Sequence, residues 1–523
     1  MLTLALLPWI AFATPAAAWI WPSPQLDALD AMLFDSSGIA LFIQPCDSFF
    51  SVTNNRGDRT SRTGYVRKAY HDMATHDVTS GTGGLDASIR LLEEQARSEN
   101  AGDGFTNTLG ALLFQSNRYV SIADLLAAAT IIAIENCGGP EINFRGGRVD
   151  AGEPNLPGVP EPQQDLDSHI AAFSRQRFTQ TEMTGLVACG YTLFGGVQHA
   201  PFPDIVPELN DPSDTESVVH SDSTPVHFDN NVATEYIAGT TQNPLVVGLN
   251  DTTNSDGRIF GSDNNILRLA GALRGDVCAR MLNTVPAGVH LTDVITPLSV
   301  KPVLRLILDG NTIQFSGEVR FWDLPEDPDR TVRLLWDDHV GGTHNVTLQL
   351  SRVVSSAGGR HTATWYSIVP LGSAFLALDA AAGITAMRFA LDGRLEDQDG
   401  VGFTAQDDLM FSASSCSNNI NGQVSGRVDV AVCGVPLCDV RDGLNPTRVY
   451  LEQEVRDSVD RTTIVELDLT PLVQTDAAAG YSIWSVDLTG FEEFSIGAEI
   501  DGEKVTRGPP TSLFGFSSCP KLL

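Results

Sequence analysis

The chain changes its hydrophobic pattern near residue 295, and this change most restricts the folds that it can adopt. Before that point, apolar residues recur at helical spacing or in long runs bounded by Gly and Pro, as in Ile122–Ile134 and Glu182–Leu193. After it, short runs rich in β-branched and apolar residues alternate with turns: Val303–Leu308, Thr331–Leu335, Thr347–Leu350 and Thr364–Val369. The pattern predicts a multidomain protein in which a mainly α-helical part is followed by a β-sandwich region.

Short internal matches predict that the β region consists of two repeated modules. The segment Phe411–Cys416 (FSASSC) resembles Phe514–Cys519 (FGFSSC), and DRTV at 329–332 resembles DRTT at 460–463. A duplication into modules at residues 296–420 and 421–523 explains these matches better than one large sheet. Chance similarity between short turns and strands is the competing explanation.

Residues 1–18 have the features of a secretory signal peptide. The apolar run Leu2–Ala13 is too short to span a bilayer, and small residues at 14–18 form a cleavage-type site. The rest of the sequence holds no stretch of about 20 apolar residues. We therefore expect a secreted, extracellular protein without a membrane span, in which the Asn-x-Thr tripeptides at Asn250 and Asn345 are accessible to glycosylation.

The charge and the cysteines agree with an exported protein. The 523 residues include 65 Asp+Glu and 33 Lys+Arg, which gives a formal net charge of −32. Such a surface repels phosphate, so nucleic acids and anionic membranes are poor partners. Most of the acid excess indicates a solvated surface, with divalent-cation sites as the alternative for a minority of the acids. The eight cysteines lack metal-type spacing, which favours disulfides.

One group of residues before position 295 carries the chemistry. Arg67 and His71 are four residues apart and lie on one face of a predicted helix. An ordered series of motifs follows: Gly83–Ser88, Ser98–Gly102, Ser121–Leu126, Asn136–Pro140, Gly146–Asp150 and Pro160–Pro162. Over residues 40–290 this series resembles the plant-type haem peroxidase superfamily, in particular its secreted fungal branch. The resemblance implies a mainly α-helical haem-peroxidase fold over residues 19–295.

The resemblance implies a catalytic role for three residues on the distal side of a haem. A neutral imidazole at His71 takes a proton from hydrogen peroxide and returns it to the departing oxygen. The guanidinium of Arg67 stabilises the negative charge that develops as the O–O bond breaks. Asn100 matches the asparagine whose side-chain carbonyl orients the imidazole. Haem b is the implied cofactor, and a small organic reductant is the implied electron donor.

Two calcium sites are also implied by the resemblance, and their residues offer the oxygen ligands that calcium prefers. The distal site comprises the side chains of Asp72, Asp86 and Ser88 with the carbonyl of Gly84. The proximal site comprises Thr192, Asp222, Thr224 and Asp229 with the carbonyl of His227. Without the resemblance, such Asp/Ser/Thr turns indicate solvated loops.

The chain departs from the family pattern at the axial iron ligand. The family has Ala-x-Gly-His-Thr-Leu in the proximal helix, whereas residues 188–193 read ACGYTL and place Tyr191 at the histidine position. This helix is predicted to begin with a capping box at Thr179 and Glu182. Asp263 matches the aspartate that normally accepts a hydrogen bond from the histidine.

Three interpretations of Tyr191 remain open. In the first, Tyr191 ligates iron as a phenolate, as in catalases. In the second, it donates a hydrogen bond to Asp263, and haem is bound loosely, by another ligand or not at all. In the third, the fold is a scaffold without redox activity. A carboxylate at Asp263 opposes ionisation of the phenol. His199 lies eight residues beyond Tyr191 and would need a chain break at Gly195-Gly196 to act as a ligand, so we expect it to be peripheral.

The resemblance also suggests disulfide partners. It pairs Cys46 with Cys137, and leaves Cys189 either as a buried free thiol or as the partner of Cys278. The four remaining cysteines are expected to pair among themselves: Cys416, Cys433, Cys438 and Cys519.

Two functions compete at this point. The first is a secreted, calcium-stabilised, monomeric haem peroxidase that reduces hydrogen peroxide and oxidises small organic donors. The second is a catalytically impaired extracellular binding or scaffold protein, whose β modules contact a polymer or a cell surface. An absorption spectrum of the purified protein distinguishes them, because only the first requires bound haem.

Overall fold

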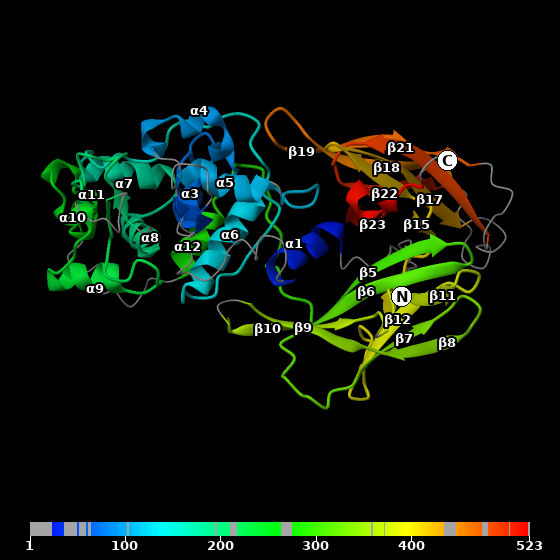
Figure 1. Ribbon diagram of the computed structural model, residues 1–523. Helices are drawn as coiled ribbons and strands as arrows, with labels where there is room; N and C mark the ends of the chain where they lie inside the picture. The colour runs from blue at the N-terminus through cyan, green and yellow to red at the C-terminus, as the bar shows by residue number, and fades with distance from the viewer. Residues whose placement is uncertain are drawn as a thin grey trace, which may run out of the picture.

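The computed structural model describes residues 23–35, 50–51, 59–60, 64–101, 104–113, 115–193, 196–209, 217–262, 275–356, 359–370, 372–433, 446–472, 480–500 and 503–520. Its α-helices precede residue 283 and its long strands follow residue 299, so the predicted change near residue 295 is confirmed (Figure 1). The predicted signal peptide, Cys46, Asp263 and Cys438 lie outside the described residues. No helix in the described ranges is long and apolar enough to cross a membrane.

The helical part contains eleven described α-helices and four very short strands. The helices are α1 (Pro24–Phe34), α3 (Gly64–Met73), α4 (Leu92–Gln95), α5 (Gly104–Leu113), α6 (Ile122–Asn136), α7 (Leu166–Arg175), α8 (Gln180–Thr192), α9 (Asn231–Ala238), α10 (Pro244–Val247), α11 (Ser255–Phe260) and α12 (Gly275–Leu282). The short strands are β1 (Phe50–Ser51), β2 (Arg59–Thr60), β3 (Val197–Gln198) and β4 (Val218–Val219).

Helix α6 forms the centre of this part, and nearly all of its 15 residues are buried. Its N-terminus is capped by the Ser121 side chain, which accepts a hydrogen bond from the Asp124 N–H. Helix α8 begins with the predicted capping box of Thr179 and Glu182. Both helices predicted from the sequence are therefore confirmed. Helices α3, α6, α8 and α12 share one hydrophobic core.

The β region is formed by twenty strands among the described residues. They are β5 (Val300–Asp309), β6 (Thr312–Trp322), β7 (Val332–Asp337), β8 (Thr343–Thr347), β9 (Gln349–Ser356), β10 (His361–Ser367), β11 (Leu376–Asp379), β12 (Ala386–Leu391), β13 (Arg394–Glu396), β14 (Phe403–Thr404), β15 (Leu409–Ser412), β16 (Cys416–Ile420), β17 (Gln423–Cys433), β18 (Pro446–Arg456), β19 (Thr462–Asp468), β20 (Thr470–Pro471), β21 (Tyr481–Thr489), β22 (Phe494–Ile500), β23 (Glu503–Thr511) and β24 (Ser517–Ser518).

These strands form one large sheet that is shared by two sandwiches. The main path of the 11-stranded sheet is β20-β21-β17-β15-β5-β6-β10-β9. One part of it packs on the five-stranded sheet that contains β7 and β12. Another part packs on the four-stranded sheet β19-β18-β22-β23. Each interface has its own hydrophobic core, as expected for sandwiches.

The predicted boundary between the two modules lies in a tight hairpin. Ile420 of β16 pairs with Gln423 of β17 across the turn Asn421-Gly422, and both turn residues have positive φ. Strands from both sides of residue 420 therefore share one sheet, and the duplication stays a prediction. The segment 347–350, predicted as one strand, is divided at buried Leu348, where the chain passes from β8 in one sheet to β9 in another.

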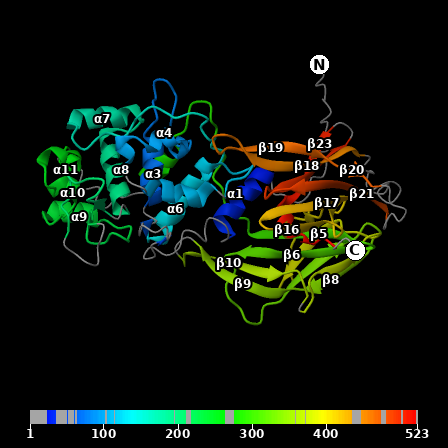
Figure 2. The same cartoon turned by 45° about the horizontal axis from the view of Figure 1, so that its top comes forward.

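Helix α1 lies between the helical part and the β region (Figures 1 and 2). Its acidic residues meet two cations of the β region, Lys301 on β5 and Arg320 on β6. Lys301 Nζ lies 2.9 Å from Asp30 Oδ2, and Arg320 Nη1 lies 2.9 Å from the same oxygen. Arg320 also contacts Asp35 at 2.5 Å. Both cations are buried, so water could not take the place of a lost partner. The cluster therefore joins the two parts through buried ion pairs.

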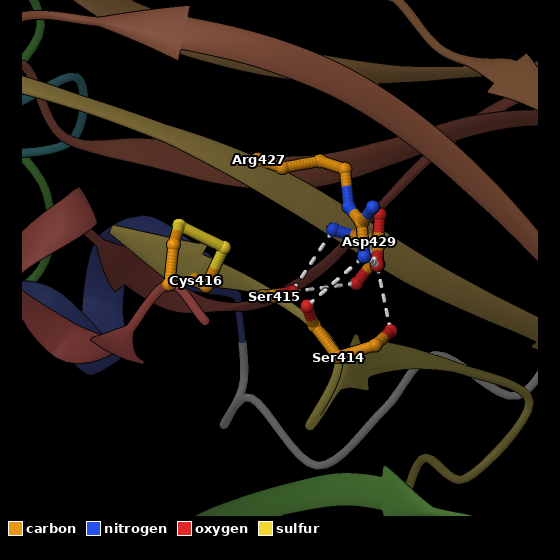
Figure 3. The surroundings of a disulfide bond; sticks show 6 residues. Ser414, Ser415, Cys416, Arg427 and Asp429 are labelled. Atoms are coloured by element: carbon orange, nitrogen blue, oxygen red, sulfur yellow. Dashed lines mark hydrogen bonds and ion pairs between the residues drawn. A yellow bond between two sulfur atoms is a disulfide. The ribbon is translucent and has the colours of Figure 1, made fainter. Parts of the chain in front are cut away.

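The disulfides include two pairs within the described ranges, Cys189–Cys278 and Cys416–Cys519. The first joins α8 to α12, which confirms one of the two alternatives for Cys189. The second ties β16 to the C-terminal segment, beside a buried polar group (Figure 3). In that group, Asp429 is fully buried and accepts hydrogen bonds from Ser414 Oγ at 2.6 Å and Arg427 Nε at 3.1 Å. Cys137 and Cys433 are also disulfide-bonded.

Candidate active site

A cavity of about 310 Å³ lies between α3 and α8. Helix α3 contributes Arg67, Tyr70 and His71, and α8 contributes Leu186, Val187, Gly190 and Tyr191. The remaining wall is largely apolar and includes Val159, Phe173, Val197, Phe202, Ile205, Leu245 and Ile259. An apolar cavity with a few convergent polar groups is the usual form of a cofactor site. Arg67, His71 and Tyr191, which were predicted from separate segments, therefore line one cavity.

Asn100 holds the imidazole of His71 in one orientation. Its Oδ1 lies 2.7 Å from His71 Nδ1, and its Nδ2 donates to the carbonyl oxygen of Glu94 at 2.7 Å. Because the amide nitrogen must face that carbonyl, the amide oxygen faces the imidazole, and the proton is assigned to Nδ1. The unprotonated nitrogen is then Nε2, which lies 3.4 Å from Arg67 Nε.

Burial sets the charges of the two distal residues. Burial and the adjacent Arg67 lower the pKa of His71 to about 3, so its imidazole is neutral near pH 7. Burial also lowers the pKa of Arg67 to about 10, which still leaves the guanidinium charged. That guanidinium lies 4.9 Å from the ring centroid of Phe105, a cation–π contact. The site therefore combines a neutral base with a fixed positive charge.

Tyr191 lies on the opposite wall, in the last turn of α8. Burial and the negative charge of Asp256 raise the pKa of its hydroxyl well above the usual value, although Arg67 has the opposite effect. The phenol is therefore neutral in the protein alone. His199 is not among the residues that line this cavity, and its Nδ1 lies 2.8 Å from the carbonyl oxygen of Val206, which agrees with the expected peripheral position.

Among the described carboxylates, Asp256 is the one whose charge raises the pKa of Tyr191, and it was not predicted from the sequence. Asp256 lies on α11, lines the cavity and is 2% exposed. Asn243 Nδ2 donates to its Oδ2 at 2.8 Å, and burial raises its pKa to about 7. The predicted Asp263 lies outside the described residues. One sequence feature could have indicated Asp256: Ser255-Asp256 is the same dipeptide as Ser262-Asp263, and it begins a short helix.

Asp72 and Asp86, two of the predicted distal calcium ligands, lie close together, Asp72 near the end of α3 and Asp86 in a buried loop. The Asp72 carboxylate accepts hydrogen bonds from the backbone N–H groups of Asp86 (2.9 Å), Ala87 (2.7 Å) and Ile89 (2.9 Å). Burial and the charge of Asp86 raise the pKa of Asp72, and burial raises that of Asp86. Gly84 has a φ of +122°, a backbone conformation that favours glycine.

An unpredicted residue, Asn155, marks the point on which the distal oxygens converge. Its Nδ2 lies 2.9 and 3.1 Å from the two oxygens of Asp86, 3.0 Å from Ser88 Oγ and 3.4 Å from Thr75 Oγ1. Carboxylate and hydroxyl oxygens around one point are the chemistry that calcium requires. The oxygens of Asp86, Ser88 and Thr75 around this point are therefore of the kind that binds calcium, whereas those of Asp72 accept backbone hydrogen bonds.

Three of the predicted proximal ligands also lie together. Thr224 Oγ1 donates to Asp229 Oδ2 at 2.9 Å, and Thr224 N–H donates to Asp222 Oδ1 at 2.9 Å. Asp222 Oδ2 is buried without a hydrogen-bond partner within the described part of the chain. Burial raises the pKa of Asp222 to about 6, as do the charges of Asp229 and Glu235. A buried carboxylate oxygen without a donor fits a cation, which would supply the missing partner.

The side chains of the other two proximal residues contact backbone carbonyl groups. Thr192 Oγ1 donates to the carbonyl of Ala188 in its own helix at 2.8 Å, and His227 Nδ1 lies 2.9 Å from the carbonyl of Cys137. Among the described residues, no group of three or more His, Cys, Asp or Glu side chains is suited to a metal ion. Each calcium site would therefore rest on two carboxylates together with hydroxyl and carbonyl oxygens.

Comparisons with known proteins agree with this geometry. The sequence model of the Peroxidase family matches residues 49–270, which include both walls of the cavity. A "WSC domain-containing protein" of Arthroderma benhamiae is 35% identical over 356 residues, which is 64% of this chain and 48% of that protein.

Two plant proteins are similar over shorter segments. "L-ascorbate peroxidase 5, peroxisomal" of Arabidopsis thaliana is 32% identical over 176 residues, 34% of this chain and 58% of that protein. "L-ascorbate peroxidase 2, cytosolic" of Oryza sativa subsp. japonica is 33% identical over 129 residues, 24% of this chain and 51% of that protein. The chain thus spans about half the length of these relatives. Over the segment 49–270, the chain is therefore similar to the Peroxidase family.

Proposed function

We propose that the cavity between α3 and α8 binds haem b and that the chain reduces hydrogen peroxide there while oxidising small organic donors. The observation that carries the proposal is the Arg67–His71–Asn100 arrangement, which lies across the cavity from Tyr191. The apolar wall and the similarity to the Peroxidase family support the same cofactor. Haem, when bound, supplies the redox-active iron.

The distal residues have separate tasks in this proposal. Nε2 of His71 takes the proton of hydrogen peroxide and later delivers it to the departing oxygen, because Asn100 keeps the other nitrogen protonated. Arg67 stabilises the negative charge on that oxygen, and its pKa of about 10 keeps it charged throughout. Asn100 is a positioning residue, since it acts through His71.

Tyr191, on the opposite wall of the cavity, would hold the iron as a ligand. Its ligating form is the phenolate, which the iron charge favours and which Asp256 opposes. The two buried carboxylate pairs, Asp72 with Asp86 and Asp222 with Asp229, would hold one calcium ion each. We further propose that the protein is secreted and monomeric, in keeping with its disulfides and acidic surface.

A second function is favoured by one specific observation, the Tyr191–Asp256 pair. If the neutral phenol does not ligate iron, the helical part is a rigid support and the β region is a binding surface for an extracellular polymer or a cell surface. The chemistry of the cavity would then have no role in the function.

The absorption spectrum of the purified protein, before and after reconstitution with haem, tests both functions. The peroxidase proposal expects a Soret band, with consumption of hydrogen peroxide that is lost in His71→Ala while the band remains. No Soret band after reconstitution contradicts that proposal and supports the binding protein. A band without peroxide turnover, in a protein with intact calcium sites, also contradicts the catalytic role.

A further inference from the structure

The β18–β19 hairpin reaches away from its own sheet and contacts the helical part of the chain (Figure 1). Its turn, residues 457–461, is here called the clasp turn. The turn is ordered by Asp457, whose carboxylate accepts hydrogen bonds from Val459 N–H (2.9 Å), Arg461 N–H (2.9 Å) and Arg461 Nε (2.7 Å). These contacts give it one shape before any contact with the helical part is counted.

Arg90 connects the clasp turn to the loop of residues 84–90, whose backbone N–H groups donate to the Asp72 carboxylate. Its Nε donates to the carbonyl oxygen of Val459 at 3.0 Å, while Nη1 donates to Ala87 at 2.7 Å and Nη2 to Ala151 at 2.5 Å. Arg90 is only 7% exposed, so these hydrogen bonds are not replaced by water when they break. One side chain therefore links three backbone segments from distant parts of the sequence.

The same loop also contacts helix α3, which carries His71 and Asp72. The N–H groups of Asp86, Ala87 and Ile89 all donate to the Asp72 carboxylate, and Asp72 directly follows His71 on α3. The loop therefore lies between Asp72 on one side and Arg90 with the clasp turn on the other.

The segment beyond Ala151 lies against the clasp turn as well. A Cβ on Gly152 would lie only 2.9 Å from Arg461 Nη1, so backbone and side chain are in close contact there. Three residues later, Asn155 Nδ2 contacts Asp86 and Ser88. The same turn thus contacts a second segment that supports the distal oxygens.

Strand β18 makes a separate contact with α5. Arg456 Nη2 donates to the carbonyl oxygens of Leu113 at 2.8 Å and Ser116 at 2.7 Å, which satisfies acceptors at the C-terminal end of that helix. Helix α5 carries Phe105, whose ring lies 5.0 Å from the imidazole of His71. Two elements around His71 are therefore contacted by one hairpin.

We propose that the β18–β19 hairpin is an internal clasp that holds the 84–90 loop and the end of α5 in place, so that the β region supports the distal side of the cavity. This goes beyond the proposed function and does not depend on it, because the contacts are within the protein alone. The partner that this surface of the hairpin fits is thus the helical part of the same chain.

Hydrogen exchange followed by mass spectrometry of the full chain tests the clasp. In one variant, residues 457–461 are replaced by Asn-Gly, a turn that suits the paired residues Arg456 and Thr462. Loss of one or two net hydrogen bonds predicts about tenfold faster exchange in the peptide that contains the Asp86, Ala87 and Ile89 amides. Unchanged exchange in that peptide overturns the proposal.

A pair of matched substitutions separates the clasp from general damage to the sheet. Arg456→Met is expected to speed exchange in α5, whereas Arg448→Met is not, because Arg448 on the same strand pairs with Glu466 and Asp468 within the β region. Equal effects of the two variants on α5 contradict the proposal. If the Asn-Gly chain does not fold, Arg461→Ala decides for the loop: unchanged exchange at 84–90 and 151–155 in that variant overturns the clasp.

Discussion

Asp256 and Tyr191 line the same buried cavity, and the negative charge of Asp256 raises the pKa of the Tyr191 hydroxyl. A carboxylate beside a histidine ligand accepts a hydrogen bond from it and strengthens it as a ligand. With a phenol in that position, the same carboxylate opposes formation of the ligating phenolate. A neighbouring charge that would strengthen a histidine ligand therefore disfavours Tyr191 as a ligand.

Replacing Tyr191 by histidine should raise the rate of hydrogen peroxide consumption after reconstitution with haem. An imidazole ligates iron in its neutral form, so the Asp256 carboxylate would then favour the ligand. The measurement is steady-state peroxide consumption, with Tyr191→Phe as the control that removes the ligand and keeps the ring. If the His and Phe variants have the same rate, the proximal position does not limit turnover.

Asp256→Asn should strengthen binding of haem by Tyr191 in the otherwise unchanged chain. The amide removes the negative charge that raises the Tyr191 pKa, so the phenolate forms more readily. Titration with haem should show tighter binding and a stronger tyrosinate-type charge-transfer band than the wild-type protein. Glu99→Gln, which removes a carboxylate elsewhere on the cavity wall, is the control and should change neither quantity. A weaker band in Asp256→Asn would contradict this account.

Asn100→Ala should slow the reaction with hydrogen peroxide by about 100-fold, because His71 loses the contact that fixes its tautomer and general acid–base catalysis contributes about 10²–10⁴-fold. Stopped-flow mixing of the haem-loaded protein with peroxide measures this step. Asn143→Ala changes an exposed residue and should have no effect. A rate that is unchanged in Asn100→Ala would show that the imidazole is oriented by other groups.

Local sequence patterns, such as capping boxes and apolar runs, correctly predicted individual helices. The capping box at Thr179 begins α8, and the apolar run at 122–134 became the buried helix α6. Contacts between distant segments were missed because no local pattern encodes them. Asp256 was not predicted, because its burial and the position of α11 beside the cavity exist only in the folded chain, whereas Asp263 stays a prediction. The hairpin at Asn421-Gly422 has a clear turn signal. The sheet that includes strands from both sides of this hairpin, however, forms by pairing of strands far apart in sequence.

Glu135 should make stability depend on pH. Its side chain is buried at 8% exposure and accepts a hydrogen bond from Ile142 N–H, and burial raises its pKa to about 7. A raised folded-state pKa gives stability that is fully present below the unfolded pKa and is lost as pH rises toward the folded value. From pH 4.5 to above 7, this site should therefore cost up to about 3 kcal/mol.

Chemical unfolding at pH 5 and pH 8 measures this dependence. Glu135→Gln should lose less stability between the two values than the wild-type protein, since the amide does not ionise. The matched control is Glu153→Gln, an exposed carboxylate that is not among the charges acting on Glu135 and should leave the dependence unchanged. The same pH dependence in both variants would show that Glu135 ionises freely in the folded protein.

Arg320→Met should destabilise the junction between the helical part and the β region. Arg320 is fully buried and pairs with Asp30 and Asp35 of the α1 segment, so its loss leaves buried carboxylates with Lys301 as the remaining cation. Removing one partner of a buried ion pair costs about 3–5 kcal/mol, whereas an exposed pair is worth about 1 kcal/mol or less. Thermal unfolding should therefore show a much larger decrease for Arg320→Met than for Arg352→Met, whose more exposed pair with Glu318 lies on the same sheet. Adding Asp35→Asn to Arg320→Met should recover part of the lost stability, because it removes one uncompensated charge. Equal decreases for Arg320→Met and Arg352→Met would mean that the cluster does not hold α1.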